Sequence, residues 1–244
     1  MADLKLFLLG PPRIELDGAS VEIQRRKALA LLGYLAVSGQ AHSRDALATL
    51  FYPEQPQSRA RAYLRRDLAN LNSGLDGAWL AADRDAIELK RGYWLDVAQF
   101  RQHLADCQSH DHPPQAVCSE CLLPLTEAAA LYGDHFLAGF TLRDSPDFDD
   151  WQFFQAENLR QELASVLAQL VQLLSDQAEY ALAIPHARRW VALDPLHEPA
   201  QRHLIQLYDQ AGQLAAAIRQ YEEYAQLLEQ ELGLPPEEET ITLY

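Results

Sequence analysis

Apolar residues in the first hundred positions alternate at short range, then recur every three or four residues, and then alternate again. The alternating runs predict short strands at 4–9, 13–16, 21–23, 79–82, 87–89 and 93–95. The longer periods predict three helices, at 26–37, 44–51 and 58–72. Strands, three helices and a terminal hairpin are the order of a winged helix-turn-helix, in which the last two helices form the motif and the hairpin is the wing.

From about residue 149 onward the chain repeats itself with a period of 34 residues. Small, apolar or aromatic residues stand at both positions of the pairs 170/204, 174/208, 178/212, 183/217, 187/221 and 190/224, each 34 residues apart. A repeat of this length resembles the tetratricopeptide repeat, in which pairs of antiparallel helices stack side by side. The sequence therefore predicts a mainly α protein with a small β part. We expect a winged helix domain at 1–97 and an all-α, tetratricopeptide-like domain at 98–244.

The helix predicted over 58–72 separates an apolar face from an arginine-rich face. The apolar face, which we expect to be buried, carries Ala60, Leu64, Leu68 and Leu71. The opposite face carries Ser58, Arg59, Ala62, Arg65, Arg66 and Ala69, with Arg61 at its margin. This helix has no lysine or glutamate and a single acid, Asp67. Because a planar guanidinium fits phosphate oxygens and guanine edges, the pattern predicts a helix that binds in the major groove of double-stranded DNA.

The charge of the chain is divided unevenly along its length. The whole chain has a net charge of −15, which by itself argues against nucleic acid as a partner. Residues 1–103, however, carry 14 Lys and Arg against 12 Asp and Glu, whereas residues 104–244 carry 6 against 23. A basic surface on the first domain is therefore compatible with DNA binding, and the acidic second domain is typical of an interaction module.

No apolar run approaches the roughly 18 residues of a membrane span, and the N-terminus lacks the basic segment of a signal peptide. Three cysteines, an odd number, indicate a reducing compartment. We therefore expect no membrane contact and a place in the cytoplasm. The chain lacks a phosphate-binding glycine loop, a nucleophile elbow and an HExxH motif, so we do not expect an enzyme.

All three cysteines lie between residues 103 and 121, close to several histidines. Cys107 and His110 form one pair with a two-residue spacer, and Cys118 and Cys121 form a second. Two-residue spacers allow both ligands of a turn to reach one ion, and Zn²⁺ accepts a tetrahedral set of three cysteines and one histidine. The segment predicts a structural zinc knuckle, with His112 as the alternative to His110. The other interpretation is a loop with free thiols.

Four motifs of the first domain resemble the N-terminal domain of the SARP-type antibiotic regulatory transcription activators. They are Leu8-Leu-Gly-Pro-Pro-Arg13, Arg25-Arg-Lys-Ala-Leu-Ala-Leu-Leu32, Asp45-Ala-Leu-Ala-Thr-Leu-Phe51 and Arg61-Ala-Tyr-Leu-Arg-Arg66. The resemblance implies an OmpR-like winged helix with 58–72 as its recognition helix. We expect Arg25, Arg26 and Lys27 to contact phosphates. The turn predicted at 90–92 places Lys90 and Arg91 at the tip of the wing.

The second domain resembles the bacterial transcriptional activator domain that follows the winged helix in SARP-type proteins. The resemblance rests on Ala128-Ala-Ala-Leu-Tyr-Gly133, Phe136-Leu-Ala-Gly-Phe140, Ala192-Leu-Asp-Pro-Leu-His-Glu198 and Glu231-Leu-Gly-Leu-Pro-Pro236. It implies transcription activation through contacts with RNA polymerase, in the bacterial cytoplasm and in association with the nucleoid. We expect a sequence-specific DNA-binding regulator that pairs as a homodimer on DNA and uses its repeats for protein interaction. The alternative is a repeat scaffold without DNA binding, whose winged helix docks proteins as the N-terminal part of a larger signalling protein.

Overall fold

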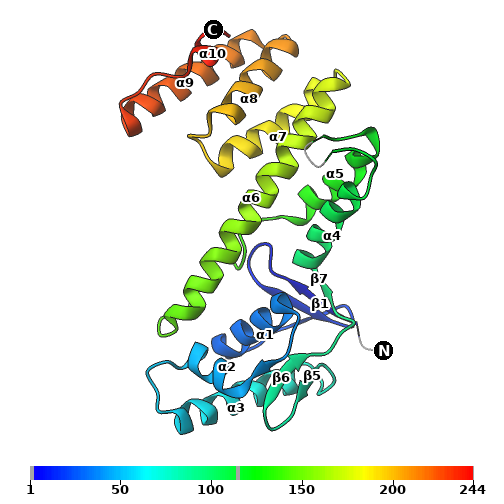
Figure 1. The fold of residues 1–244 in the computed structure, drawn as a ribbon, viewed down its shortest axis with the longest axis vertical. Helices are drawn as coiled ribbons and strands as arrows, with labels where there is room; N and C mark the ends of the chain where they lie inside the picture. The colour runs from blue at the N-terminus through cyan, green and yellow to red at the C-terminus, as the bar shows by residue number, and fades with distance from the viewer. Residues whose placement is uncertain (1–2, 114–115, 244) are drawn as a thin grey trace. The chain divides into compact units, whose positions relative to one another are not determined.

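The computed structural model describes residues 3–113 and 116–243, and Figure 1 shows their fold. The chain divides into two compact units. The first holds the residues up to 102 together with 131–159, and the second holds 103–130 together with the residues from 160 onward. This division differs from the boundary expected at 97/98, because the segment 131–159 returns to pack with the first unit.

A four-stranded sheet opens the first unit, in the order β3-β2-β1-β7. Its strands are β1 (Leu4–Phe7), β2 (Arg13–Leu16), β3 (Ala19–Val21) and β7 (Trp94–Leu95). β1 pairs antiparallel with β2 and parallel with β7. Alternate residues of β1 and β2 face the core, where Leu4, Leu6, Ile14 and Leu16 are buried. This is the alternation that the sequence pattern predicts for a strand with one buried face.

A second sheet has the order β4-β6-β5 and is built from β4 (His42–Ser43), β6 (Ala86–Leu89) and β5 (Leu80–Ala82). β5 and β6 form a hairpin, which turns at 83–85 instead of at the predicted tip at 90–91. Two features differ from the sequence prediction. The short β4 pairs with β6, and β7 joins the other sheet instead of extending the wing. The wing is therefore the β5–β6 hairpin, and residues 90–93 lead from it to the other sheet.

Three helices follow in the predicted order, α1 (Arg26–Ser38), α2 (Arg44–Phe51) and α3 (Gln57–Gly74). Ser43 caps α2, because its hydroxyl oxygen accepts a hydrogen bond from the backbone N–H of Ala46 at 3.1 Å. α3 begins after Pro56 and buries the predicted apolar stripe. Ala60, Leu64, Leu68 and Leu71 are all at most 8% exposed. α2 and α3 form the helix-turn-helix, and the arginine face of α3 remains exposed.

The returning segment is fixed to the first unit by backbone hydrogen bonds and by aromatic packing. The backbone N–H of Leu137 donates to the carbonyl oxygen of Leu8 at 2.8 Å. At the start of α6 (Pro146–Asp176), the ring of Phe148 packs against that of Phe51, with centroids 5.4 Å apart. These contacts are made between residues far apart in the sequence, so no local pattern indicates them.

The second unit is helical in its described residues. Parts of α4 (Asp96–Gln108), α5 (Leu122–Leu131) and α6 belong to it, with η1 (Ser119–Cys121) directly before α5. The elements after α6 are α7 (Tyr180–Leu193), α8 (Glu198–Gln210), α9 (Leu214–Leu232) and α10 (Glu238–Ile241). α6 and α8 end 34 residues apart, and α7 and α9 begin 34 residues apart. Ala178 and Gly212 stand at equivalent turns, and both have positive φ, of 56° and 71°. The predicted internal period is therefore present in the backbone.

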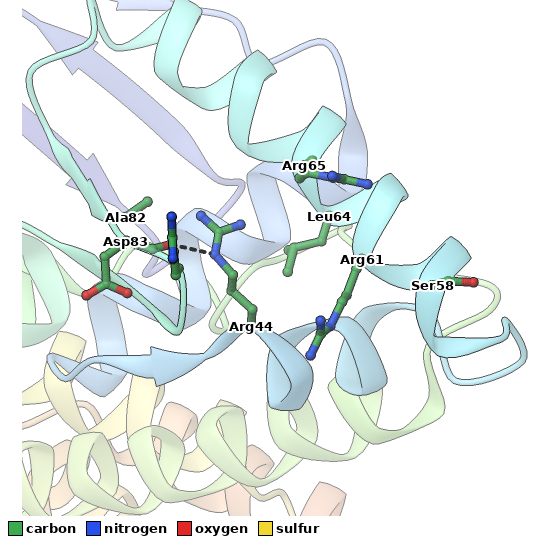
Figure 2. A pocket seen from close by; sticks show the side chains of 8 residues that line it. Arg44, Ser58, Arg61, Leu64, Arg65, Ala82 and Asp83 are labelled. Carbon is green, nitrogen blue, oxygen red and sulfur yellow. Dashed lines mark hydrogen bonds between the residues drawn. The ribbon is translucent and has the colours of Figure 1, made fainter.

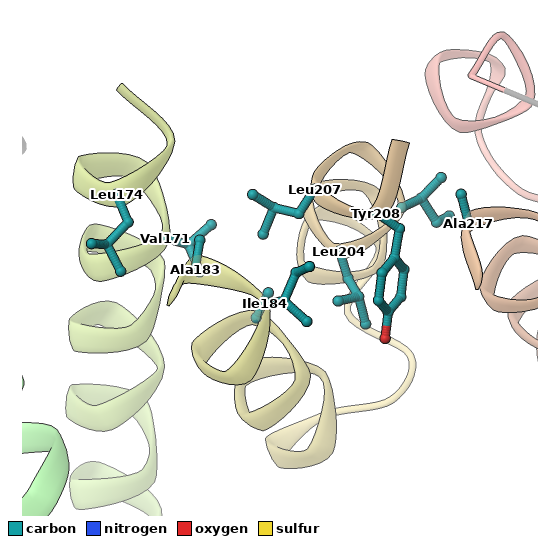
Figure 3. Packing of buried hydrophobic residues seen from close by; sticks show 10 residues of the cluster. Val171, Leu174, Ala183, Ile184, Leu204, Leu207, Tyr208 and Ala217 are labelled. Atoms are coloured by element: carbon teal, nitrogen blue, oxygen red, sulfur yellow. The ribbon is translucent and has the colours of Figure 1, made fainter. Parts of the chain in front are cut away.

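Apolar side chains from α6, α7, α8 and α9 form the core of the second unit (Figure 3). They are Val171, Leu174, Ala183, Ile184, Ala187, Leu204, Ile205, Leu207, Tyr208 and Ala217. The alanines allow neighbouring helices to approach closely, and the larger side chains fill the space between helix pairs. Across the part of the chain that the structure describes, no helix combines the length and the apolar character needed to cross a membrane.

Candidate nucleic-acid interface

A groove on the first unit lies between α3 and the β5–β6 hairpin (Figure 2). It has a volume of about 790 Å³ and is lined by Arg44, Ser58, Arg61, Leu64, Arg65, Ala82, Asp83 and Arg84. A neighbouring hollow of about 390 Å³ shares Arg44, Arg65 and Ala82 with it and reaches along α3 to Asn72. Because arginines make up half of the lining, we call this surface the arginine groove.

Arg44 connects the wing to the helix-turn-helix. It is the first residue of α2, and its Nε donates to the carbonyl oxygen of Asp83 at 2.7 Å. Figure 2 shows this side chain extending from α2 toward the hairpin. The Asp83 carboxylate in turn accepts the backbone N–H groups of Asp85 and Ala86, which lowers the pKa of Asp83. These hydrogen bonds fix the turn of the wing, so that Arg84 lies beside α3 in the same groove.

Arg61 is held in the arginine groove by a two-pronged ion pair. Its Nε and Nη2 donate to the two carboxylate oxygens of Asp45, at 2.5 and 2.6 Å. Hydrogen bonds from Arg61 and Gln57 lower the pKa of Asp45 to about 2, so this carboxylate is ionised at neutral pH. The sequence places Arg61 near the core, whereas its side chain is 54% exposed. Asp45 offsets one of the positive charges of the groove.

The other predicted residues of α3 divide between the groove and its flank. Ser58 and Arg65 are exposed and line the groove. Arg59 and Arg66 are exposed but lie outside its lining, and Ala62 is half-buried. The helix therefore presents arginines both to the groove and to the surface next to it.

The basic run at the start of α1, which the sequence predicts to contact phosphates, makes contacts within the first unit. Arg25 Nε donates to Asp67 Oδ1 at 2.6 Å, and Asp67 is 1% exposed. Arg26 donates to a backbone carbonyl of the returning segment at 2.9 Å. Lys27 forms an ion pair with Asp144 at 2.9 Å. The partners come from α3 and from residues more than one hundred positions further along the chain, so the sequence pattern does not reveal them.

Lys90 and Arg91 do not lie at the tip of the wing, where the sequence analysis placed them. Lys90 follows β6, and its Nζ donates to the carbonyl oxygen of Ala78 at 2.7 Å, next to the start of β5. Arg91 is exposed in the connection between the two sheets. The arginine at the tip is Arg84, which is not among the residues predicted to bind DNA. Its place between the strands predicted at 79–82 and 87–89 is the signal that could have found it.

The predicted metal segment comes together with a different ligand set. His110, His112, Cys118 and Cys121 each bring one ligand atom to within 4.8 Å of the others. Cys107 is not among them. Its thiol is buried and lies 3.8 Å from the carbonyl oxygen of Cys121. His112 therefore joins His110 in the cluster instead of replacing it.

Comparison with known proteins identifies the family. The bacterial transcriptional activator domain matches residues 95–244, which is more than half of the chain. The chain belongs to the bacterial transcriptional activator domain family. The resemblance of the sequence to SARP-type activators is thereby confirmed.

The relatives match nearly the whole chain. Transcriptional regulatory protein MoaR1 of Mycobacterium tuberculosis is 25% identical over 241 residues, which are 97% of this chain and 76% of that protein. MoaR1 of Mycobacterium bovis matches to the same extent. The structure of Mycobacterium tuberculosis EmbR in complex with a low-affinity phosphopeptide is similar over all of this chain, with a TM-score of 0.75 and 22% identity. This chain spans 64% of the EmbR chain, and the likeness confirms the predicted fold class.

Proposed function

We propose that this protein is a transcription regulator that binds double-stranded DNA in a sequence-specific manner. In this proposal α3 enters the major groove and the β5–β6 hairpin contacts the adjacent backbone. The observation that carries it is the arginine groove, where α2, α3 and the wing bring Arg44, Arg61, Arg65 and Arg84 to one surface. Membership of a family of transcriptional activators supports the same function.

The chemistry of α3 suits a major groove, which at about 12 Å wide admits one α-helix. Arg65 is exposed in the middle of α3, where its guanidinium can donate two hydrogen bonds to a guanine edge. Ala69, one turn further along, is exposed and small, so the helix can approach the bases closely. Arg59 and Arg66 flank the groove and are assigned to phosphates. Arg61 reaches DNA only by exchanging Asp45 for another acceptor, so we assign it a smaller share of the affinity.

We infer that the helical repeats serve protein contacts, including RNA polymerase and a second copy of the chain on DNA. Two observations support this assignment. Stacked helix pairs form an extended surface that needs no reactive groups to bind a partner. The residues from 104 onward are also strongly acidic, so this part of the chain is repelled by DNA and is available to other proteins.

The direct test is selection of bound duplexes from a random-sequence pool by the full chain. We expect the recovered sequences to converge on one site, with two half-sites about one helical turn apart if two copies bind together. The affinity for the selected duplex should exceed that for a scrambled duplex by about 10³ or more. Equal affinity for both duplexes would contradict the proposal, because a basic surface alone gives only non-specific binding.

A further inference from the structure

Four metal-binding side chains of the second unit converge on one point. Cys121 Sγ lies 3.2 Å from His110 Nδ1 and 3.2 Å from His112 Nε2. Cys118 Sγ lies 3.4 Å from His110 Nδ1 and 3.7 Å from Cys121 Sγ. Each residue contributes one ligand atom, and all four atoms lie within 4.8 Å of one another.

These four of the six separations are close to those of ligands around a tetrahedral zinc ion. Zn–S bonds of about 2.3 Å and Zn–N bonds of about 2.0–2.1 Å place two sulfurs ~3.8 Å apart and a sulfur and a nitrogen ~3.6 Å apart. The observed 3.7 Å between the sulfurs and 3.2–3.4 Å between sulfur and nitrogen agree with that geometry to within a few tenths of an ångström. A single ion at the centre can therefore reach all four ligands with small adjustments of the side chains.

The surrounding structure also orients the ligands. The backbone N–H of Cys121 donates to the carbonyl oxygen of Cys118 at 3.0 Å. This hydrogen bond closes a tight turn, and the thiols of Cys118 and Cys121 lie on the same side of it, 3.7 Å apart. The Nδ1 of His112 lies 3.0 Å from the carbonyl oxygen of Pro113, and an N–H there leaves Nε2 as the metal-binding atom. Metal-bound histidines commonly donate their second nitrogen to a carbonyl in this way.

We propose that His110, His112, Cys118 and Cys121 bind one zinc ion in a closed structural site. The site joins the segment after α4 to η1 at the start of α5, and the described part of that segment outside the ligands is mostly exposed. Four protein ligands leave no open position, so the ion stabilises the local fold instead of catalysing a reaction. The third cysteine of the region, Cys107, takes no part in binding, because its thiol lies outside the set of converging atoms.

The first test is the metal content of the full chain, purified without added zinc and without chelators. We expect about one zinc ion per chain, since four ligands form one site. Replacing the zinc with Co²⁺ should give the visible bands of a tetrahedral site together with thiolate-to-cobalt charge transfer in the near ultraviolet. Less than about 0.2 equivalents of zinc, with no tetrahedral cobalt spectrum after titration of the metal-free chain, would overturn the proposal.

Variants then identify the ligands. Cys118→Ser and His112→Ala should abolish tight cobalt binding, whereas Cys107→Ser and His103→Gln should retain the spectrum of the unmodified chain. Loss of that spectrum in Cys107→Ser together with its retention in His112→Ala would overturn the ligand set. If a ligand variant fails to fold, the content and spectrum of the unmodified chain and of Cys107→Ser still decide the outcome. No measurement here uses DNA, so the result is independent of the proposed function.

Discussion

At the scale of single residues, the buried Asp67 gives Arg25 a structural role. Its carboxylate is buried on α3 and accepts hydrogen bonds from Arg25 and from the hydroxyl of Tyr52. The hydrogen bond from Arg25 to this carboxylate raises the pKa of the guanidinium. A buried carboxylate is costly unless it is paired, so Arg25 has a structural role through its Nε, while its side chain remains 44% exposed.

We predict that Arg25→Ala lowers the free energy of unfolding by about 2 kcal/mol, because it leaves the Asp67 carboxylate without its charged partner. Urea denaturation followed by circular dichroism measures this loss. The matched control is Arg59→Ala on α3, an exposed arginine whose removal should change stability by no more than about 0.5 kcal/mol. Unchanged stability of Arg25→Ala, combined with weaker DNA binding, would show that Arg25 contacts DNA instead.

The sequence distinguishes these arginines only in part. The period of α3 correctly separates its buried stripe from its exposed arginines, because that separation depends on residues within a few positions of one another. The role of Arg25 depends on Asp67, which lies 42 positions away, and that of Lys27 on Asp144, 117 positions away. The sequence alone does not show whether a basic side chain forms an ion pair with a residue far along the chain.

At the scale of elements, the wing also depends on contacts between distant residues that the sequence pattern does not show. The helices of the first unit are predicted closely, since their caps and apolar periods are local signals. The alternation in 79–95 also predicts strands, but it does not say which strands pair. β7 pairs with β1 at the other end of the domain sequence, and this choice removes Lys90 and Arg91 from the wing tip and leaves Arg84 there.

We predict that Arg84→Ala weakens binding to the selected duplex and to a scrambled duplex by similar factors, and that it reduces the slope of log K against log salt by about 1. This result is expected of an arginine at the wing tip that contacts a phosphate. Arg91→Ala, which removes the same charge from an exposed site outside the wing, should leave affinity and slope nearly unchanged. Fluorescence anisotropy at several salt concentrations measures both. The reverse ranking of the two variants would assign the phosphate contact to Arg91 and not to Arg84.

At the scale of the whole molecule, a chain with a net charge of −15 is proposed to bind a polyanion. The attraction therefore has to come from a local surface, since the total charge of the chain repels DNA. The arginine groove supplies that surface, and its basic side chains come from three separate elements that the fold brings together. Binding should accordingly depend on a few arginines in the groove and on its flank, and not on arginines of the second unit.

The most direct measurement of this claim compares the affinity of two variants for the selected duplex. Arg65→Ala removes an exposed arginine from α3, and Arg219→Ala removes an exposed arginine from α9. We predict that Arg65→Ala loses about 1–3 kcal/mol of binding free energy, roughly a 5- to 150-fold rise in Kd, while Arg219→Ala stays within about twofold of the unmodified chain. Equal affinities for both variants and the unmodified chain would contradict the assignment of the arginine groove to DNA.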